Sequence, residues 1–405
     1  MTWIDLTLGD ALRVKHGFAF KGEFFAQEGA LLVVTPGNFV EAGGFRVRPG
    51  KERYYTSEFP DDYLLRQGDL IIAMTEQGEG LLGSAARIPD DDKYLHNQRI
   101  GLITIPRADL LDSRFAYWLF NSWPVRDQLR GSSTGTKVKH TAPERIYKVR
   151  TRVPGVEAQS QIAARLDAYN DLIQNNERRI ALLEETGRLL YREWFVSLRC
   201  PGVDCLEPSG GLPKGWTLGT VDDLASFVHR GITPQYDESA SGLAINQKCI
   251  RGGRLTLSSA RRQSKETKSN RQLQVGDVLI NSTGAGTLGR VAQVRVPLSE
   301  CTVDTHVTIV RPIDPKTAAY LGVALLEKEA LLSTMGVGST NQLELPRADI
   351  SALPILCPPE ALQTAFHDLV WPLFTQTESL ALSTEKLKEA RDALLPKLMS
   401  GELTV

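Results

Sequence analysis

A long run of regularly spaced apolar residues constrains this chain more than any other feature. Between Val156 and Phe195, apolar side chains recur at alternating steps of four and three residues, with no proline between them. A period of about 3.5 residues keeps one stripe of a helix facing a partner helix. At about 1.5 Å per residue the predicted helix is roughly 60 Å long, which is too long for one globular core and indicates a spacer. The ladder positions are Ile162, Leu166, Tyr169, Ile173, Asn176, Ile180, Leu183, Gly187, Leu190 and Trp194.

A second ladder of the same period lies in the last part of the sequence. We expect Pro372 to kink or break its first turns, because proline lacks an N–H group and clashes with the preceding turn. The simplest arrangement is that the two helices pack against each other, and the alternative is that each packs on a separate helical domain. The positions of the second ladder are Leu362, Phe366, Leu369, Leu373, Gln376, Leu380, Ser383, Leu387, Ala390 and Leu394.

The two halves of the chain also repeat the same order of motifs. Each half opens near a tryptophan, Trp3 or Trp216, and continues to a Gly-Asp turn, Gly68-Asp69 or Gly276-Asp277, at an offset of 276 − 68 = 208 residues. An apolar strand and a glycine-rich loop follow each turn, and each half ends in a long helix. Further strands are predicted over residues 100–106 and 307–312, and short helices over 114–120 and 318–332.

This repeat predicts a mixed α/β (α+β) fold of two pseudo-symmetric β/α domains joined by a long antiparallel pair of coiled-coil helices. We expect one domain near each end of the helical rod, as in a calliper. The predicted parts are a first domain at 1–153, a spacer helix at 154–199, a linker at 200–215, a second domain at 216–355 and a second spacer helix at 356–405.

Charge and cysteine content limit the classes of function. The formal net charge of −1 excludes a uniformly basic nucleic-acid binder. Residues 130–152 and 251–271 nevertheless each hold seven Lys or Arg against one acid, a local balance of 7 − 1 = +6 that suits contact with phosphates. No apolar run approaches the ~18 residues of a membrane span. The five scattered cysteines form no metal-binding spacing, which predicts a protein of the reducing cytoplasm.

Enzyme motifs are mostly absent from the sequence, which has no P-loop, no HExxH and no clustered histidines. Polar glycine-rich loops are repeated instead, at 75–78 and 132–137 in the first half and at 282–287 and 338–342 in the second. Small hydroxyl residues and glycine let a backbone approach phosphates, whereas Gln, Asn, Arg and His reach base edges. The alternative is that these glycines only form tight hairpins. The loops differ in side chains between the halves, as expected if each domain reads a different sequence.

The chain resembles the specificity subunits of type I restriction–modification systems. The resemblance covers essentially the whole chain and rests on four motifs: Gly215-Trp216 after Leu212-Pro213, Gly276 to Ile280, Glu193 to Val196, and Leu394 to Leu403. It implies a non-catalytic protein whose two target-recognition domains each read one half of a bipartite, asymmetric site in double-stranded DNA. It also implies two methyltransferase subunits and restriction (translocase) subunits as partners. No cofactor is expected in this chain, since S-adenosylmethionine, ATP and Mg²⁺ would be bound by those partners.

The repeated loops supply the candidate DNA contacts, with no catalytic and no metal-binding residue predicted. Two other functions stay open: the recognition subunit of a modification-only or anti-phage methylation complex, and a scaffold that binds protein. The candidate DNA-binding residues are Lys15, His16, Thr75, Gln77, Arg99, Ser133, Thr134 and Lys137 in the first domain, and Arg230, Thr233, Ser282, Thr283, Arg290, His306, Thr340 and Asn341 in the second.

Overall fold

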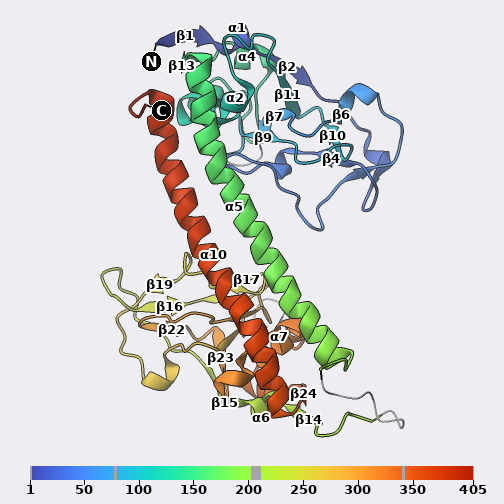
Figure 1. Cartoon of the computed structure of the whole chain (residues 1–405), viewed down its shortest axis with the longest axis vertical. Helices are drawn as coiled ribbons and strands as arrows, with labels where there is room; N and C mark the ends of the chain where they lie inside the picture. Colours follow the sequence, from blue (N-terminus) through green and yellow to red (C-terminus); the bar gives the residue numbers. More distant parts are fainter. Residues whose placement is uncertain (1, 77–79, 202–210, 340–342, 405) are drawn as a thin grey trace. The chain divides into compact units, whose positions relative to one another are not determined.

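A computed structural model describes residues 2–76, 80–201, 211–339 and 343–404, and its helices and strands are drawn in Figure 1. The chain forms two compact units, Met1–Gln174 with Glu385–Val405 (unit 1) and Asn175–Thr384 (unit 2). Each unit combines antiparallel sheets, short helices and segments of the two long helices, so the predicted mixed α/β class is confirmed. The predicted domain boundaries remain predictions.

Unit 1 is built on a four-stranded antiparallel sheet in the order β2-β11-β7-β9, beside a five-stranded sheet in the order β3-β5-β4-β10-β6. Helix α2 covers the first sheet with a nearly continuous apolar surface that includes the fully buried Phe115 and Phe120. The bounds are β1 Trp3–Thr7, α1 Leu8–Ala11, β2 Arg13–His16, β3 Phe25–Ala26, β4 Leu32–Val34, β5 Tyr54–Tyr55, β6 Leu64–Leu65, β7 Leu70–Ala73, β8 Thr75–Glu76, β9 Ala85–Arg87, β10 Tyr94–His96, β11 Ile100–Thr104, α2 Ser113–Phe120, α3 Trp123–Gly131, β12 Lys139–His140, α4 Pro143–Tyr147 and β13 Arg150–Pro154.

Unit 2 repeats this plan, with a four-stranded sheet in the order β15-β23-β20-β21 and a three-stranded sheet in the order β19-β16-β22. The bounds are β14 Thr217–Thr220, α6 Val221–Leu224, β15 Ala225–Arg230, β16 Leu243–Ile245, β17 Ile250–Arg251, β18 Arg254–Leu255, β19 Arg261–Arg262, β20 Val278–Asn281, β21 Val291–Gln293, β22 Cys301–Val303, β23 Val307–Pro312, α7 Ala318–Glu327, α8 Glu329–Thr334, α9 Arg347–Ser351 and β24 Pro354–Cys357. The prediction of one helix over 318–332 is wrong, because α7 ends at Glu327 and a second helix, α8, begins at Glu329. The Glu329 carboxylate accepts the Val291 N–H at 2.9 Å.

Matching hydrogen bonds in the two units show that the sequence repeat is also a structural repeat. Thr7 and Asp10 form a reciprocal capping box at the start of α1, and Thr220 and Asp223 form the same box at α6. At the start of each long helix a glutamine side chain donates to the carbonyl of a preceding proline at 2.8 Å. These pairs are Gln159 with Pro154 and Gln363 with Pro358.

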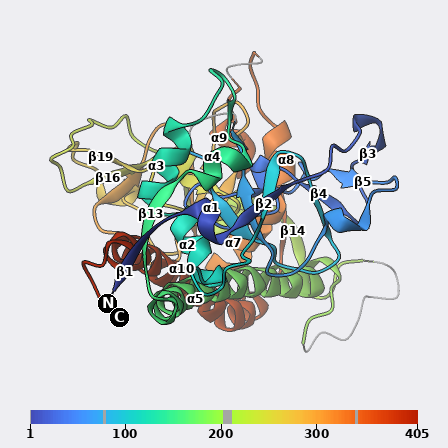
Figure 2. The ribbon, with the colours of Figure 1, turned by 90° about the horizontal axis from the view of Figure 1, so that it is seen from above.

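Helix α5 spans Val156–Tyr191 and continues as a π-helical turn, Arg192–Val196. Every position of the first predicted ladder is buried or half-buried, so that prediction is confirmed. Helix α10 spans Glu360–Ser400 and packs antiparallel to α5 within each unit (Figures 1 and 2). In unit 1, Arg391 donates to the Asn170 side chain at 2.7 Å, and in unit 2 Trp194 contacts Phe366.

Helix α10 corrects two predictions about the second ladder. It runs through Pro372 without a break; the helix is held on both sides of the proline by the buried Val370 and Phe374, and this packing outweighs a local cost of about 3 kcal/mol. Leu362 and Phe366 are buried as predicted, but from residue 369 onward the buried stripe lies one residue later than the predicted one. Thr377 and Thr384 are buried, whereas the predicted ladder positions Leu369, Gln376 and Ser383 are exposed.

Candidate nucleic-acid interface

In unit 1 a polar loop and a hairpin meet at the end of the central sheet. Strand β8 follows β7 directly and pairs with β12, placing Thr75 opposite His140. The Thr75 hydroxyl lies 3.2 Å from His140 Nδ1. Thr134 also pairs with His140 through two backbone hydrogen bonds, and Arg145 donates to the Thr134 hydroxyl at 2.9 Å. Thr75 itself is buried, so it fixes the hairpin from inside while Thr134 and His140 are exposed.

Two buried charged side chains hold the ends of the loop that follows β8. The Glu76 carboxylate accepts the Leu82 N–H at 2.6 Å and is itself buried. Arg126 on α3 donates to the carbonyls of Leu82, Glu41 and Gly80. Its burial lowers the Arg126 pKa to about 10, which leaves the guanidinium charged at neutral pH. Charge-assisted bonds of this kind are stronger than neutral ones and define where the loop begins and ends.

The other predicted residues of unit 1 divide between this hairpin and a neighbouring surface. Ser133 and Lys137 lie in the turn that leads into the hairpin, where Ser133 donates to Arg130 O at 2.7 Å. Arg99 is exposed, and its carbonyl accepts the Met74 N–H, so its turn is beside β8. His16 is exposed at the end of β2, whereas Lys15 points to Asp62 and the Tyr63 ring, 4.5 Å from the ring centroid.

In unit 2 the corresponding cluster is centred on Thr283. Its hydroxyl lies 2.7 Å from His306 Nδ1 and accepts the Gln247 side-chain N–H at 3.2 Å. Ser282 is fully buried, with its hydroxyl 2.6 Å from that of Thr308. Ser282 therefore supports the loop from inside the sheet, whereas His306 is exposed at the surface.

An ion pair links strand β15 of unit 2 to this cluster. Arg230 at the end of β15 contacts Glu344 at 2.6 Å and donates to Leu345 O at 3.0 Å. Glu344 forms a bridge with Thr283, just as His140 pairs with Thr75 in unit 1. Arg290 donates to Gly286 O at 2.8 Å and so closes the intervening loop.

The structure thus brings most of the predicted residues into one polar cluster per unit. Thr75, Arg99, Ser133, Thr134 and Lys137 belong to the unit 1 cluster or its immediate turns. The unit 2 cluster holds Arg230, Ser282, Thr283, Arg290 and His306, with Thr233 in the exposed loop after β15. Lys15 and His16 are the exceptions, because the Lys15 side chain belongs to the aromatic surface around Tyr63 and His16 is exposed at the end of β2. Gln77, Thr340 and Asn341 lie outside the described residues.

Sequence reasoning missed several members of these clusters. His140, Glu344 and Gln247 each contact a predicted threonine or arginine, and Arg126 and Arg145 hold the unit 1 loops. Thr75 and His140 are 65 positions apart, so no local spacing could have joined them. The sequence repeat is the signal that could have pointed to these residues, since Glu344 of unit 2 occupies the place of His140 in unit 1.

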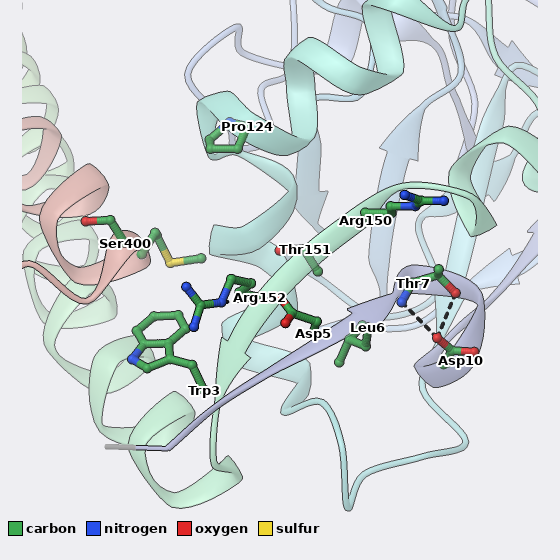
Figure 3. Close-up of a pocket in the computed structure, with 11 residues that line it drawn as sticks. Trp3, Asp5, Leu6, Thr7, Asp10, Pro124, Arg150, Thr151, Arg152 and Ser400 are labelled. Carbon is green, nitrogen blue, oxygen red and sulfur yellow. Dashed lines mark hydrogen bonds and ion pairs between the residues drawn. The ribbon is translucent and has the colours of Figure 1, made fainter.

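A separate depression of about 700 Å³ lies in unit 1 and contains none of the predicted residues. Strands β1 and β13 form its floor, and Figure 3 shows Trp3, Asp5 and Arg152 beside the end of α10. Arg152 forms an ion pair with Asp5 at 3.3 Å. The indole of Trp3 packs on Gly401, whose φ of +79° suits the residue that ends a helix. This depression is part of the packing of β1 against α10.

The described residues form neither a metal site nor a membrane-spanning helix. No group of three or more His, Cys, Asp or Glu side chains is placed to hold a metal ion in the part of the chain that the structure covers. Within residues 2–76, 80–201, 211–339 and 343–404, no helix has both the length and the apolar character needed to cross a membrane.

The fold and the two clusters define a class of protein with tandem recognition domains on paired helices. Comparisons with known proteins agree with this class. Residues 1–185 match the family model described as the type I restriction modification DNA specificity domain. The chain is 27% identical over 315 residues to the type I restriction enzyme MjaIX specificity subunit of Methanocaldococcus jannaschii, covering 75% of this chain and 72% of that protein.

Two more comparisons extend the match. The HindI specificity subunit of Haemophilus influenzae is 24% identical over 329 residues, which are 78% of this chain and 65% of that protein. The crystal structure of a type I restriction–modification S subunit from M. genitalium has the same fold, with a TM-score of 0.67 at 14% identity over 98% of this chain and 96% of that chain. The resemblance to type I restriction–modification specificity subunits that was seen in the sequence is therefore confirmed.

Proposed function

We propose that this subunit reads a bipartite, asymmetric site in double-stranded DNA, one half-site with each unit. The observation that carries the proposal is the polar cluster repeated in both units on one framework, with different side chains at equivalent positions. The His140 position of unit 1 holds Glu344 in unit 2, and imidazole and carboxylate groups select different base edges. Lys, Arg and hydroxyl groups of the same loops would anchor phosphates.

In this proposal α5 and α10 act as the spacer between half-sites, and two methyltransferase subunits dock on the chain. Restriction (translocase) subunits join that complex. S-adenosylmethionine, ATP and Mg²⁺ are bound by these partners, and this chain supplies recognition. The match to a DNA specificity domain over residues 1–185 supports this division of labour.

The test is to co-express the chain with the methyltransferase encoded beside it and map methylated adenines across the host genome. We expect a split motif with two short, unlike half-sites and a fixed gap. Exchanging one unit's polar cluster should change one half-site only. A complex that forms but methylates no split motif would contradict the proposal and favour a protein-binding scaffold. Methylation without any restriction activity would favour a modification-only complex.

A further inference from the structure

Equivalent segments of the two units carry very different charge. Residues 251–271 of unit 2, here called the basic arm, hold seven Lys or Arg and one acid, a balance of 7 − 1 = +6. Residues 43–63 of unit 1 lie at an offset of 208 and hold four of each sign, 4 − 4 = 0. Each segment contains a strand that pairs antiparallel with an earlier strand, β19 with β16 and β5 with β4. These earlier strands also have equivalent parallel partners, β22 for β16 and β10 for β4. The segments are therefore structural equivalents.

The charge of the basic arm is not neutralised within the described part of the chain. Of its seven cations, only Arg254 forms an ion pair there, with Glu184 at 3.5 Å. Arg261 and Arg262 are exposed on β19, and Lys265 and Lys268 are exposed after it. Like charges held together repel one another, and a bound polyanion relieves that repulsion.

The arm is ordered by contacts that leave its charged groups at the surface. The Arg261 guanidinium stacks over the Tyr236 ring at 3.5 Å from the centroid. Arg262 donates to Ala240 O at 2.7 Å, and Lys265 donates to Thr233 O at 3.0 Å. In the described part of unit 2, β19 is the outer named strand of its sheet. The segment around Tyr236 lies along its outer side, where the Asp237 N–H donates to Arg262 O at 3.2 Å and Tyr236 forms a bridge with Gln263.

The arm is continuous with the polar cluster of unit 2. Arg271, its last residue, donates to the carbonyls of Arg230 and Gly231 at 2.6 and 2.7 Å. Arg230 in turn contacts Glu344 and Leu345 in the cluster itself. A DNA backbone bound at the polar cluster of unit 2 would therefore reach the basic arm along the same surface.

We propose that the basic arm is a phosphate clamp that grips the DNA backbone beside the half-site read by unit 2. This inference rests on the proposed function and adds an asymmetry to it: residues 251–271 of unit 2 grip phosphates, and the equivalent residues 43–63 of unit 1 contribute far less. Arg251 lies apart on β17, Arg254 is paired with Glu184, and Arg271 donates to the carbonyls of Arg230 and Gly231. The clamp residues are the exposed cations of β19 and the segment after it: Arg261, Arg262, Lys265 and Lys268.

The test measures how binding of a fluorescent duplex carrying the mapped site depends on salt, using the full chain with its methyltransferase subunits. Each phosphate contact contributes about 0.9 to the slope of log K against log salt concentration. The R261Q/R262Q/K265Q/K268Q variant should therefore lose about 3 to 4 from the slope, on the mapped site and on a scrambled duplex alike. The matched control R46Q/R48Q/K51Q/R53Q removes the same charge from unit 1 and should lose less than about 1.

The outcomes separate this inference from the proposed function. Wild-type protein that binds the mapped duplex without preference over the scrambled one would contradict the proposed function itself. Site-specific binding with equal slopes for wild type and the unit 2 variant, or with equal losses in both variants, would overturn the clamp. If the fourfold variant unfolds, R261Q/K268Q changes two exposed side chains and should still lose about 2 from the slope.

Discussion

Asp277 and Asp69 occupy the same place in the two copies of the Gly-Asp turn, yet their surroundings differ. Asp277 is fully buried, and both of its oxygens accept from the Arg311 guanidinium at 2.7 and 2.8 Å. The Asp69 carboxylate accepts the Arg66 N–H at 2.8 Å and is half-buried. Removing the charge of a buried carboxylate breaks its ion pair at a large cost, whereas a half-buried turn residue stays partly solvated in either state.

We expect Asp277→Asn to lower the free energy of unfolding of unit 2 by about 3 kcal/mol, because it leaves Arg311 unpaired. The matched change Asp69→Asn should cost unit 1 less than about 1 kcal/mol. Hydrogen exchange of β20 and β23 against β7 and β11, across a urea series, measures both. Equal losses of unfolding free energy in the two units would show that the burial of Asp277 does not determine its contribution to stability.

His96 predicts how the stability of unit 1 depends on pH. Its ring is fully buried beside Ile100 O, and burial lowers its pKa to about 4. The folded pKa lies below the unfolded value of about 6.5, so the unfolded state binds the proton more strongly. The stabilisation is complete above about pH 6.5 and is lost as the pH falls toward 4, by about 3 kcal/mol in all. Melting of wild type and His96→Gln from pH 7.5 to 4.5 tests this: the variant should be less stable at neutral pH but less sensitive to acid.

At the scale of elements, the contact between α5 and α10 depends on Gly187. A Cβ atom built there would lie 2.7 Å from Phe374 Cε1 and 3.3 Å from Val370 Cγ1. Both neighbours are buried in the unit 2 core, so they have little room to move. The two helices therefore approach closely at this position, and a larger residue would push them apart.

Gly187→Ala should destabilise unit 2 by about 1 to 2 kcal/mol, since overpacking outweighs the gain of about 1 kcal/mol in helix propensity. Gly131→Ala is the control, because nothing lies within 4 Å of a Cβ at the end of α3, and it should be neutral or slightly stabilising. Denaturant unfolding followed by circular dichroism compares the two. A stabilised Gly187→Ala variant would contradict the close helix contact.

At the scale of the whole molecule, the proposed function makes helix length a determinant of the DNA site. Inserting seven residues after Gln174 in α5 and seven after Thr384 in α10 adds about 10.5 Å to each helix. At about 3.4 Å per base pair the gap of the methylated motif should grow by about three base pairs. Both half-sites should stay the same, because neither polar cluster is changed. Methylation mapping with an unchanged gap would show that the helices do not act as the spacer.

Much of this architecture could be predicted from the sequence, because local patterns determine it. The 3.5-residue period of α5, the β-branched runs that became β11 and β23, and the repeated Gly-Asp turns all depend on neighbours along the chain. The antiparallel pairing of the long helices and the two-fold repeat followed from these patterns. Most predicted contact residues lie in one cluster per unit for the same reason, since the repeat placed equivalent loops at equivalent strand ends.

Only the tertiary structure decided which side chains meet and which faces are buried. The stripe of α10 follows Thr377 and Thr384, whose hydroxyls donate to helix carbonyls at 2.7 and 2.8 Å and can therefore be buried. The basic run at 130–152 is divided, because Arg150 and Arg152 lie on β13 opposite Thr7 and Asp5 of β1, whereas residues 251–271 remain one arm. Sequence period determines the type and length of an element, but contacts between distant residues determine its phase and its partners.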